Sequence, residues 1–315
     1  MDDDLDPELL AVLEVAANAE EPRRIDFAPV RNGVDYLLSA VTHLTEVSDP
    51  PSDRDLKYAV LHLHAATEVL LKARLVSEHW SLVFKDPAKA TRKNYVAGRF
   101  SSTTVEGAIS RLRDIAGVDI GESNRAAITK LSETRNAFTH YGHSASAPAI
   151  ESQATRVLDF LVDFIDEHLH EQASQRRPGD DVGNMRLIRA RLGKIDSLVK
   201  ARMRDVTAGL GDLLGQTVQC PACRQYAVVA GEAPHCRFCK AKWSTPNDLA
   251  VLYVLSVVGQ DNGQLQACGS CELDGAATTL VLGVSTADEP NKDDVGLCFR
   301  CGVKYHAKWT LVTGD

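Results

Sequence analysis

Eight cysteines carry the clearest chemical signal in this 315-residue chain. They form four Cys-x-x-Cys pairs with none left over, and the first 219 residues contain no cysteine. Two thiolates at this spacing reach one metal ion from a tight turn, and two such pairs complete a tetrahedral site. The pairs are Cys220 with Cys223, Cys236 with Cys239, Cys268 with Cys271, and Cys298 with Cys301. We therefore expect two structural Zn²⁺ sites, ligated by all eight cysteines, with no open position for a catalytic water.

The order of the pairs suggests how they combine. Twelve residues separate the first two pairs, and twenty-six separate the last two. Sequential pairing predicts one ribbon over 220–239 and a second over 268–301; interleaved pairing around a helix expected near 247–258 is the alternative. Redox or iron–sulfur chemistry would be the other use of these thiols. A redox Cys-x-x-Cys normally stands alone beside a βαβ unit, which this sequence lacks.

A second motif lies in the segment LSETRNAFTHYGH, which contains Arg135, Asn136 and His140. Histidine exchanges a proton near neutral pH, and the planar guanidinium of arginine binds phosphate through two parallel hydrogen bonds. This combination suits acid–base chemistry at a phosphodiester. Residues five apart lie about 140° around an ideal helix. The side chains therefore converge only if the helix loosens toward Gly142 or a second subunit completes the site.

Hydrophobic periodicity predicts helices throughout 31–172, because apolar residues recur there at intervals of three and four and no segment alternates with period two. Pro50 and Pro51 break the pattern, and Asp53 is expected to cap a long helix that ends near His79. The helical order, together with the Arg135–His140 motif, resembles the HEPN superfamily (higher eukaryotes and prokaryotes nucleotide-binding).

The resemblance implies a helical bundle that forms a homodimer in which two motifs face one cleft. It also implies a metal-independent endoribonuclease with RNA as its substrate, acting as a toxin or defence effector. By carry-over, His140 would be the general acid or base, Arg135 would hold the scissile phosphate, and Asn136 would orient groups at the cleft. The alternative is a non-catalytic HEPN dimer, an adaptor or nucleic-acid-binding regulator that recruits a protein partner through its zinc ribbons.

A basic stretch follows the bundle. Residues 176–204 carry nine Lys and Arg against three Asp and Glu, in a chain of net charge −8. Ile188, Leu192, Ile195 and Val199 repeat in steps of four and three, which predicts the seam of a packed or coiled helix. The seam is a candidate dimer contact. The basic faces are either a solvated surface or a guide for RNA.

The fold class is therefore mainly α, with a small β-rich region at the C-terminal end. We expect an acidic segment over 1–25, a HEPN-like bundle over 26–175, a basic amphipathic connector helix over 176–213, and a double zinc-ribbon domain over 214–315. The longest apolar run, 249–259, is too short to span a bilayer. The first residues are acidic, unlike a secretory signal, so a cytoplasmic protein without membrane partners is expected.

Elemental analysis of the purified protein should find two zinc ions per chain. This follows because four Cys-x-x-Cys pairs supply ligands for two complete tetrahedral sites. A chain without zinc, or one with an iron–sulfur absorption band, would contradict the assignment.

Overall fold

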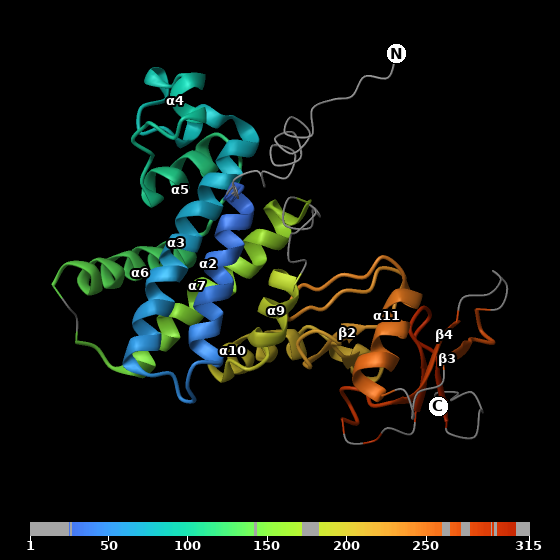
Figure 1. Cartoon of the computed structure of the whole chain (residues 1–315). Coiled ribbons are helices and arrows are strands. Elements are labelled where there is room, and N and C mark those ends of the chain that lie inside the picture. Colours follow the sequence, from blue (N-terminus) through green and yellow to red (C-terminus); the bar gives the residue numbers. More distant parts are fainter. Residues whose placement is uncertain are drawn as a thin grey trace, which may run out of the picture.

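The chain forms a helical bundle followed by two antiparallel β-sheets (Figure 1). The computed structural model describes residue 25 and residues 27–141, 144–171, 183–259, 265–271, 278–290, 292 and 295–306. The expectation of a mainly helical protein with a small β-rich region is confirmed. The acidic segment 1–25 lies outside the described residues except for Ile25. Within the described ranges, no helix combines the length and apolar character that crossing a membrane requires.

The bundle is organised around one long central helix. The helices of this region are α2 (Pro29–Thr45), α3 (Asp53–Glu78), α4 (Arg92–Val96), α5 (Val105–Asp114), α6 (Glu122–His140) and α7 (Ala147–His168), with short 3₁₀ turns η1 (Trp80–Val83) and η2 (Pro87–Lys89). Helix α3 packs against α2, α5, α6 and α7. Its residues Leu63, Leu70 and Leu71 are fully buried, so the apolar periodicity of α3 fixes the positions of its neighbours.

The N-cap of helix α3 lies one residue before the expected position. Ser52, rather than Asp53, is the N-cap, and its hydroxyl accepts the backbone N–H of Asp55. The Asp55 carboxylate in turn accepts the backbone N–H of Ser52, which completes a capping box. Hydrogen bonds from Ser52, Ser48 and His43 hold the pKa of Asp55 far below its usual value. This network fixes the turn between α2 and α3.

The connector forms two helices in its described part, not the single helix expected over 176–213. These are α9 (Gly183–Leu192) and α10 (Asp196–Ala208), and the break falls at Gly193. A Cβ atom on Gly193 would lie closer than 3.0 Å to the carbonyl oxygen of Cys223. The connector therefore bends where its backbone meets the first cysteine turn, a long-range contact that helical periodicity does not reveal.

The seam of the connector faces its own chain. Ile188, Leu192 and Ile195 are buried in the core that they share with the bundle, and Val199 is half-buried against that core. Helix α9 packs on α2, and α10 packs on α7 and β2. The apolar repeat is thus accounted for by packing within the chain, so it gives no support to a dimer contact.

Acidic groups of the bundle pair with the connector bases. Arg191 donates to the carboxylate of Glu46 at 2.5 Å. Arg202 lies 2.5 Å from the carboxylate of Asp159 and 2.7 Å from that of Asp163, and it also donates to the carbonyl of Phe238 beside the second cysteine pair. Two of the connector bases that suggested an RNA guide therefore join the bundle, the connector and the first cysteine region.

The C-terminal region is built from short elements. They are η3 (Gly211–Gln216), β1 (Thr217–Gln219), β2 (Tyr226–Val229), α11 (Pro246–Tyr253), a π-helical turn η4 (Val254–Val258), β3 (Leu265–Ala267), β4 (Thr278–Val284), β5 (Val295–Cys298) and β6 (Lys304–His306). Strands β1 and β2 pair in one antiparallel sheet, and β3-β4-β5-β6 form the second. Helix α11 packs against β4. One continuous core runs from the bundle through the connector to Cys220, Cys223 and Phe299.

Replacing Gly193 with alanine should lower the free energy of unfolding by about 1–3 kcal/mol, because the new methyl group overlaps backbone that cannot move without displacing the cysteine turn. Gly231→Ala is the matched control, since nothing lies within 4 Å of its added Cβ. Urea denaturation of the two variants measures the difference. Equal stability of Gly193→Ala and wild type would show that the connector does not rest on this turn.

Candidate functional site

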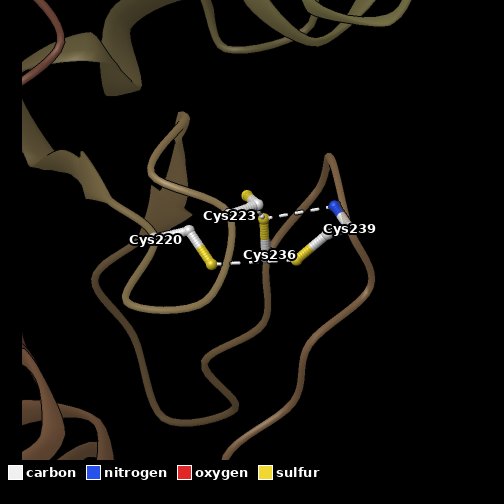
Figure 2. Close-up of side chains that lie close together, drawn as sticks. All are labelled: Cys220, Cys223, Cys236 and Cys239. Atoms are coloured by element: carbon white, nitrogen blue, oxygen red, sulfur yellow. Dashed lines mark hydrogen bonds between the residues drawn. The ribbon is translucent and has the colours of Figure 1, made fainter. Parts of the chain in front are cut away.

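The first two cysteine pairs form one compact cluster (Figure 2). The sulfur atoms of Cys220 and Cys239 are 3.8 Å apart, and those of Cys223 and Cys236 are 3.7 Å apart. A tetrahedral ion with metal–sulfur bonds of about 2.3 Å has sulfur–sulfur edges of about 3.8 Å. A disulfide would need about 2.05 Å. The spacing therefore fits four thiolates around one metal ion.

The last two pairs form a second cluster of the same size. The sulfur atoms of Cys268 and Cys301 are 3.8 Å apart, and those of Cys271 and Cys298 are 3.9 Å apart. The hydroxyl of Tyr305 lies 3.4 Å from the Cys268 sulfur, within reach to donate to a thiolate. These two groups confirm the sequential pairing expected from the sequence.

Three of the cysteine turns share one backbone geometry. The residue after the second cysteine, Arg224, Lys240 or Gly302, has a positive φ and donates its N–H to the carbonyl of the first cysteine at 2.9–3.0 Å. The first cysteine then donates its own N–H across a short hairpin, at 2.7–3.0 Å. This turn directs both sulfur atoms of a pair to the same side. Each such turn therefore supplies two of the four thiolates of a cluster.

The two clusters differ in exposure. The four cysteines of the first are all buried, whereas in the second Cys301 is exposed and Cys271 is half-buried. The first cluster also lies in the core shared with the connector. We expect any metal in the second cluster to exchange more readily.

Arg135 lines a cleft of about 710 Å³ in the bundle. The walls of this Arg135 cleft come from α3, from residues 102–106 at the start of α5, and from α6. The Arg135 side chain is half-buried, and its guanidinium donates to the side-chain oxygen of the exposed Asn136 at 2.9 Å. Arg135 therefore lies at a concave surface, and Asn136, which does not line the cleft, is hydrogen-bonded to it.

His140 lies apart from this cleft. It is the last residue of α6 and is exposed, and it is absent from the residues that line the cleft. The helix remains regular through His140, so it does not loosen before that residue. Gly142 lies outside the described residues. One chain thus presents Arg135 and His140 on different parts of its surface.

His64 also lines the Arg135 cleft, although it is not part of the Arg135–His140 motif. Its side chain is 8% exposed, and neither ring nitrogen has a hydrogen-bond partner within the described part of the chain. Burial lowers the pKa of His64 below its usual value, and the charges of Arg135 and Lys72 lower it further while Glu68 opposes them. A neutral imidazole therefore faces the cleft at neutral pH.

The spacing of residues in the sequence does indicate which helix face carries His64. His64, Glu68 and Lys72 recur every four residues along α3 and so lie on one face of that helix. Lys72 donates to the Glu68 carboxylate at 2.5 Å, as expected for this spacing. The face that carries this ion pair is also the face that carries His64 into the cleft.

Comparisons with protein-family models, with curated proteins and with solved structures find no match for this chain. The site is therefore interpreted from its own geometry.

A chelator should remove bound metal in two phases, with the second cluster losing its ion first, because Cys301 is exposed and the first cluster is buried. A colorimetric chelator assay follows the release. The variant Cys301→Ser should lose the fast phase alone, whereas one shared phase in wild type would show that exposure does not set the order.

Proposed function

We propose that this protein is a metal-independent endoribonuclease of the HEPN type whose two cysteine clusters hold structural Zn²⁺. The observation that carries the proposal is the position of Arg135. Its guanidinium forms a wall of a cleft that also holds a neutral imidazole and several hydroxyl groups. Charge on a phosphate is stabilised best by such a fixed guanidinium in a partly dehydrated site.

The proposed reaction is a transesterification within the RNA strand. The ribose 2′-oxygen attacks the adjacent phosphorus, and the bond from phosphorus to the 5′-oxygen breaks. A base accepts the 2′-proton, and an acid donates a proton to the departing 5′-oxygen, so the products are a 2′,3′-cyclic phosphate and a 5′-hydroxyl. Arg135 would hold the phosphate oxygens, Asn136 would fix the Arg135 side chain, and His140 would transfer a proton.

A second subunit is part of this proposal. His140 lies outside the Arg135 cleft of its own chain, so a homodimer would have to bring the exposed end of one α6 toward the cleft of its partner. Tyr141, which follows His140 directly, is 82% exposed. A large aromatic group with this exposure is suited to burial against a second subunit or against an RNA base.

The zinc ions would supply structure and no chemistry. Each would be ligated by four cysteine thiolates, which leaves no position for water or substrate. The strands of this region are three to seven residues long, so metal binding would contribute much of their folding free energy. Thiolate sites of this kind persist in a reducing compartment, which is consistent with a cytoplasmic toxin or defence effector.

A non-catalytic adaptor is the second candidate. The separation of His140 from the Arg135 cleft within one chain favours it. In that case the exposed second ribbon would recruit a protein partner. Cleavage assays separate the two candidates directly.

His140→Ala should reduce the rate of RNA cleavage by about 10²- to 10⁴-fold, which is the usual rate contribution of a general acid or base. Arg135→Lys should also lose most activity, because a single ammonium group cannot replace the planar fork of donors. Gel analysis of a labelled single-stranded RNA measures both. Thr139→Ala and Lys130→Ala, exposed positions on the same helix, are the controls and should cleave like wild type.

Both motif variants should keep the melting temperature of the wild type, since His140 is exposed and contributes little packing. Cleavage should also persist in EDTA during an incubation too short to strip the ribbons. If His140→Ala cleaves as fast as wild type, the catalytic proposal is wrong and the adaptor becomes the leading candidate.

A further inference from the structure

The segment 80–100 forms a lobe on the bundle, outside the Arg135–His140 motif. It contains η1, η2 and α4 and lies at the opposite end of the bundle from the β-sheets (Figure 1). Backbone hydrogen bonds of 2.8 Å, from Lys85 to Ser101 and from Thr103 to Val83, attach it to the chain before α5. Arg111 of α5 donates to the carbonyls of Leu82 and Phe84. This basic lobe is therefore held in a fixed position.

Its charge is strongly positive. Residues 85–99 carry five Lys and Arg against one Asp, in a chain of net charge −8. Lys89 pairs with Asp86 at 3.3 Å. Lys85, Lys93 and Arg99 are exposed and have no acidic partner among the described residues. Of the connector bases, Arg191 and Arg202 are paired with acids of the bundle, whereas Arg186 and Lys200 are exposed like the cations of the lobe.

Aromatic rings accompany these cations. The ring centres of Trp80 and Tyr95 are 5.5 Å apart. The exposed Arg92 guanidinium lies 5.6 Å from the Trp80 ring centre and 5.5 Å from that of Tyr95. Guanidinium and aromatic surfaces held together in this way accept unstacked bases of a single strand.

The lobe is continuous with the Arg135 cleft. Residues 101–103, which pair with the lobe, lead directly into the cleft wall formed by residues 102–106. Lys72 donates to the hydroxyl of Ser102 at 2.9 Å, at the boundary between the two. Residues 101–103 therefore join the lobe to the cleft wall, and a strand bound at that edge of the lobe would lie next to the cleft.

We propose that the basic lobe binds single-stranded RNA next to the Arg135 cleft, with phosphates at Lys85, Lys93 and Arg99 and bases against Arg92, Trp80 and Tyr95. This inference rests on the proposed function, because it names the surface that would deliver the substrate to that site. The combination of unpaired cations with rings and a guanidinium matches the two features of a single strand, its phosphates and its bases. An acidic peptide offers charge but no flat bases to stack.

The test measures binding of the full zinc-loaded chain to a labelled 2′-O-methyl RNA, which has no free 2′-hydroxyl to attack the phosphate. The variant Lys85→Gln/Lys93→Gln/Arg99→Gln should bind roughly tenfold more weakly at low salt, and the slope of log K against log salt should fall by about two. The control Arg186→Gln/Lys200→Gln/Arg204→Gln removes the same charge from exposed connector positions and should bind nearly as wild type.

Arg92→Lys provides a second variant that keeps the charge. It should still weaken binding, because an ammonium group lacks the flat face that stacks on a base. The proposal is overturned if the lobe triple variant binds as wild type, or if the control triple variant weakens binding equally. The first result would exclude the lobe as the RNA-binding surface. The second would show that binding depends on the net charge of the chain rather than on this surface.

Failure of this inference is separable from failure of the proposed function, because uncleavable RNA reports binding alone. If His140→Ala abolishes cleavage while the lobe variant binds normally, only the lobe assignment is wrong. If wild type never cleaves RNA but the lobe variant loses binding, the lobe assignment holds and the catalytic proposal fails.

Discussion

The fold depends on the contact between the connector and the first cysteine cluster. Short strands such as β1 and β2 cannot bury a core of their own. They are held because four thiolates converge on one point and because the turn at Cys223 rests against Gly193. Arg202 strengthens the same junction by linking Asp159 and Asp163 of α7 to the carbonyl of Phe238. The first ribbon is therefore part of the bundle's core rather than an appendage.

This junction leaves the opposite end of the bundle free for function. The Arg135 cleft and the basic lobe both lie against α3 and α5, on elements that do not contribute to the cysteine clusters. The chain has a net charge of −8, yet Lys85, Lys93 and Arg99 of the lobe are exposed and have no acidic partner among the described residues. The structure thus places the two cysteine clusters and the Arg135 cleft on different elements.

Sequence patterns predicted the features that depend on contacts between residues close together in the chain. The cysteine turns form within a few residues, so the four pairs and their sequential grouping could be recognised. Periodicity likewise predicted that Ile188 and Leu192 are buried, but not that they face their own chain. The break at Gly193 depends on a carbonyl thirty residues further along the chain, and the lowered pKa of His64 depends first on its burial and then on the charge of Arg135 from another helix. Such long-range contacts have no signature in a single sequence.

The central claim is that the ribose 2′-hydroxyl of the substrate is the nucleophile at the Arg135 cleft. The most direct measurement is mass spectrometry of the products formed from one RNA and from the same RNA with a single 2′-deoxy nucleotide at the cleaved position. We predict 2′,3′-cyclic phosphate ends from the first and no cleavage at the modified position of the second. Cleavage at the deoxy position, or products with 3′-hydroxyl ends, would contradict the account.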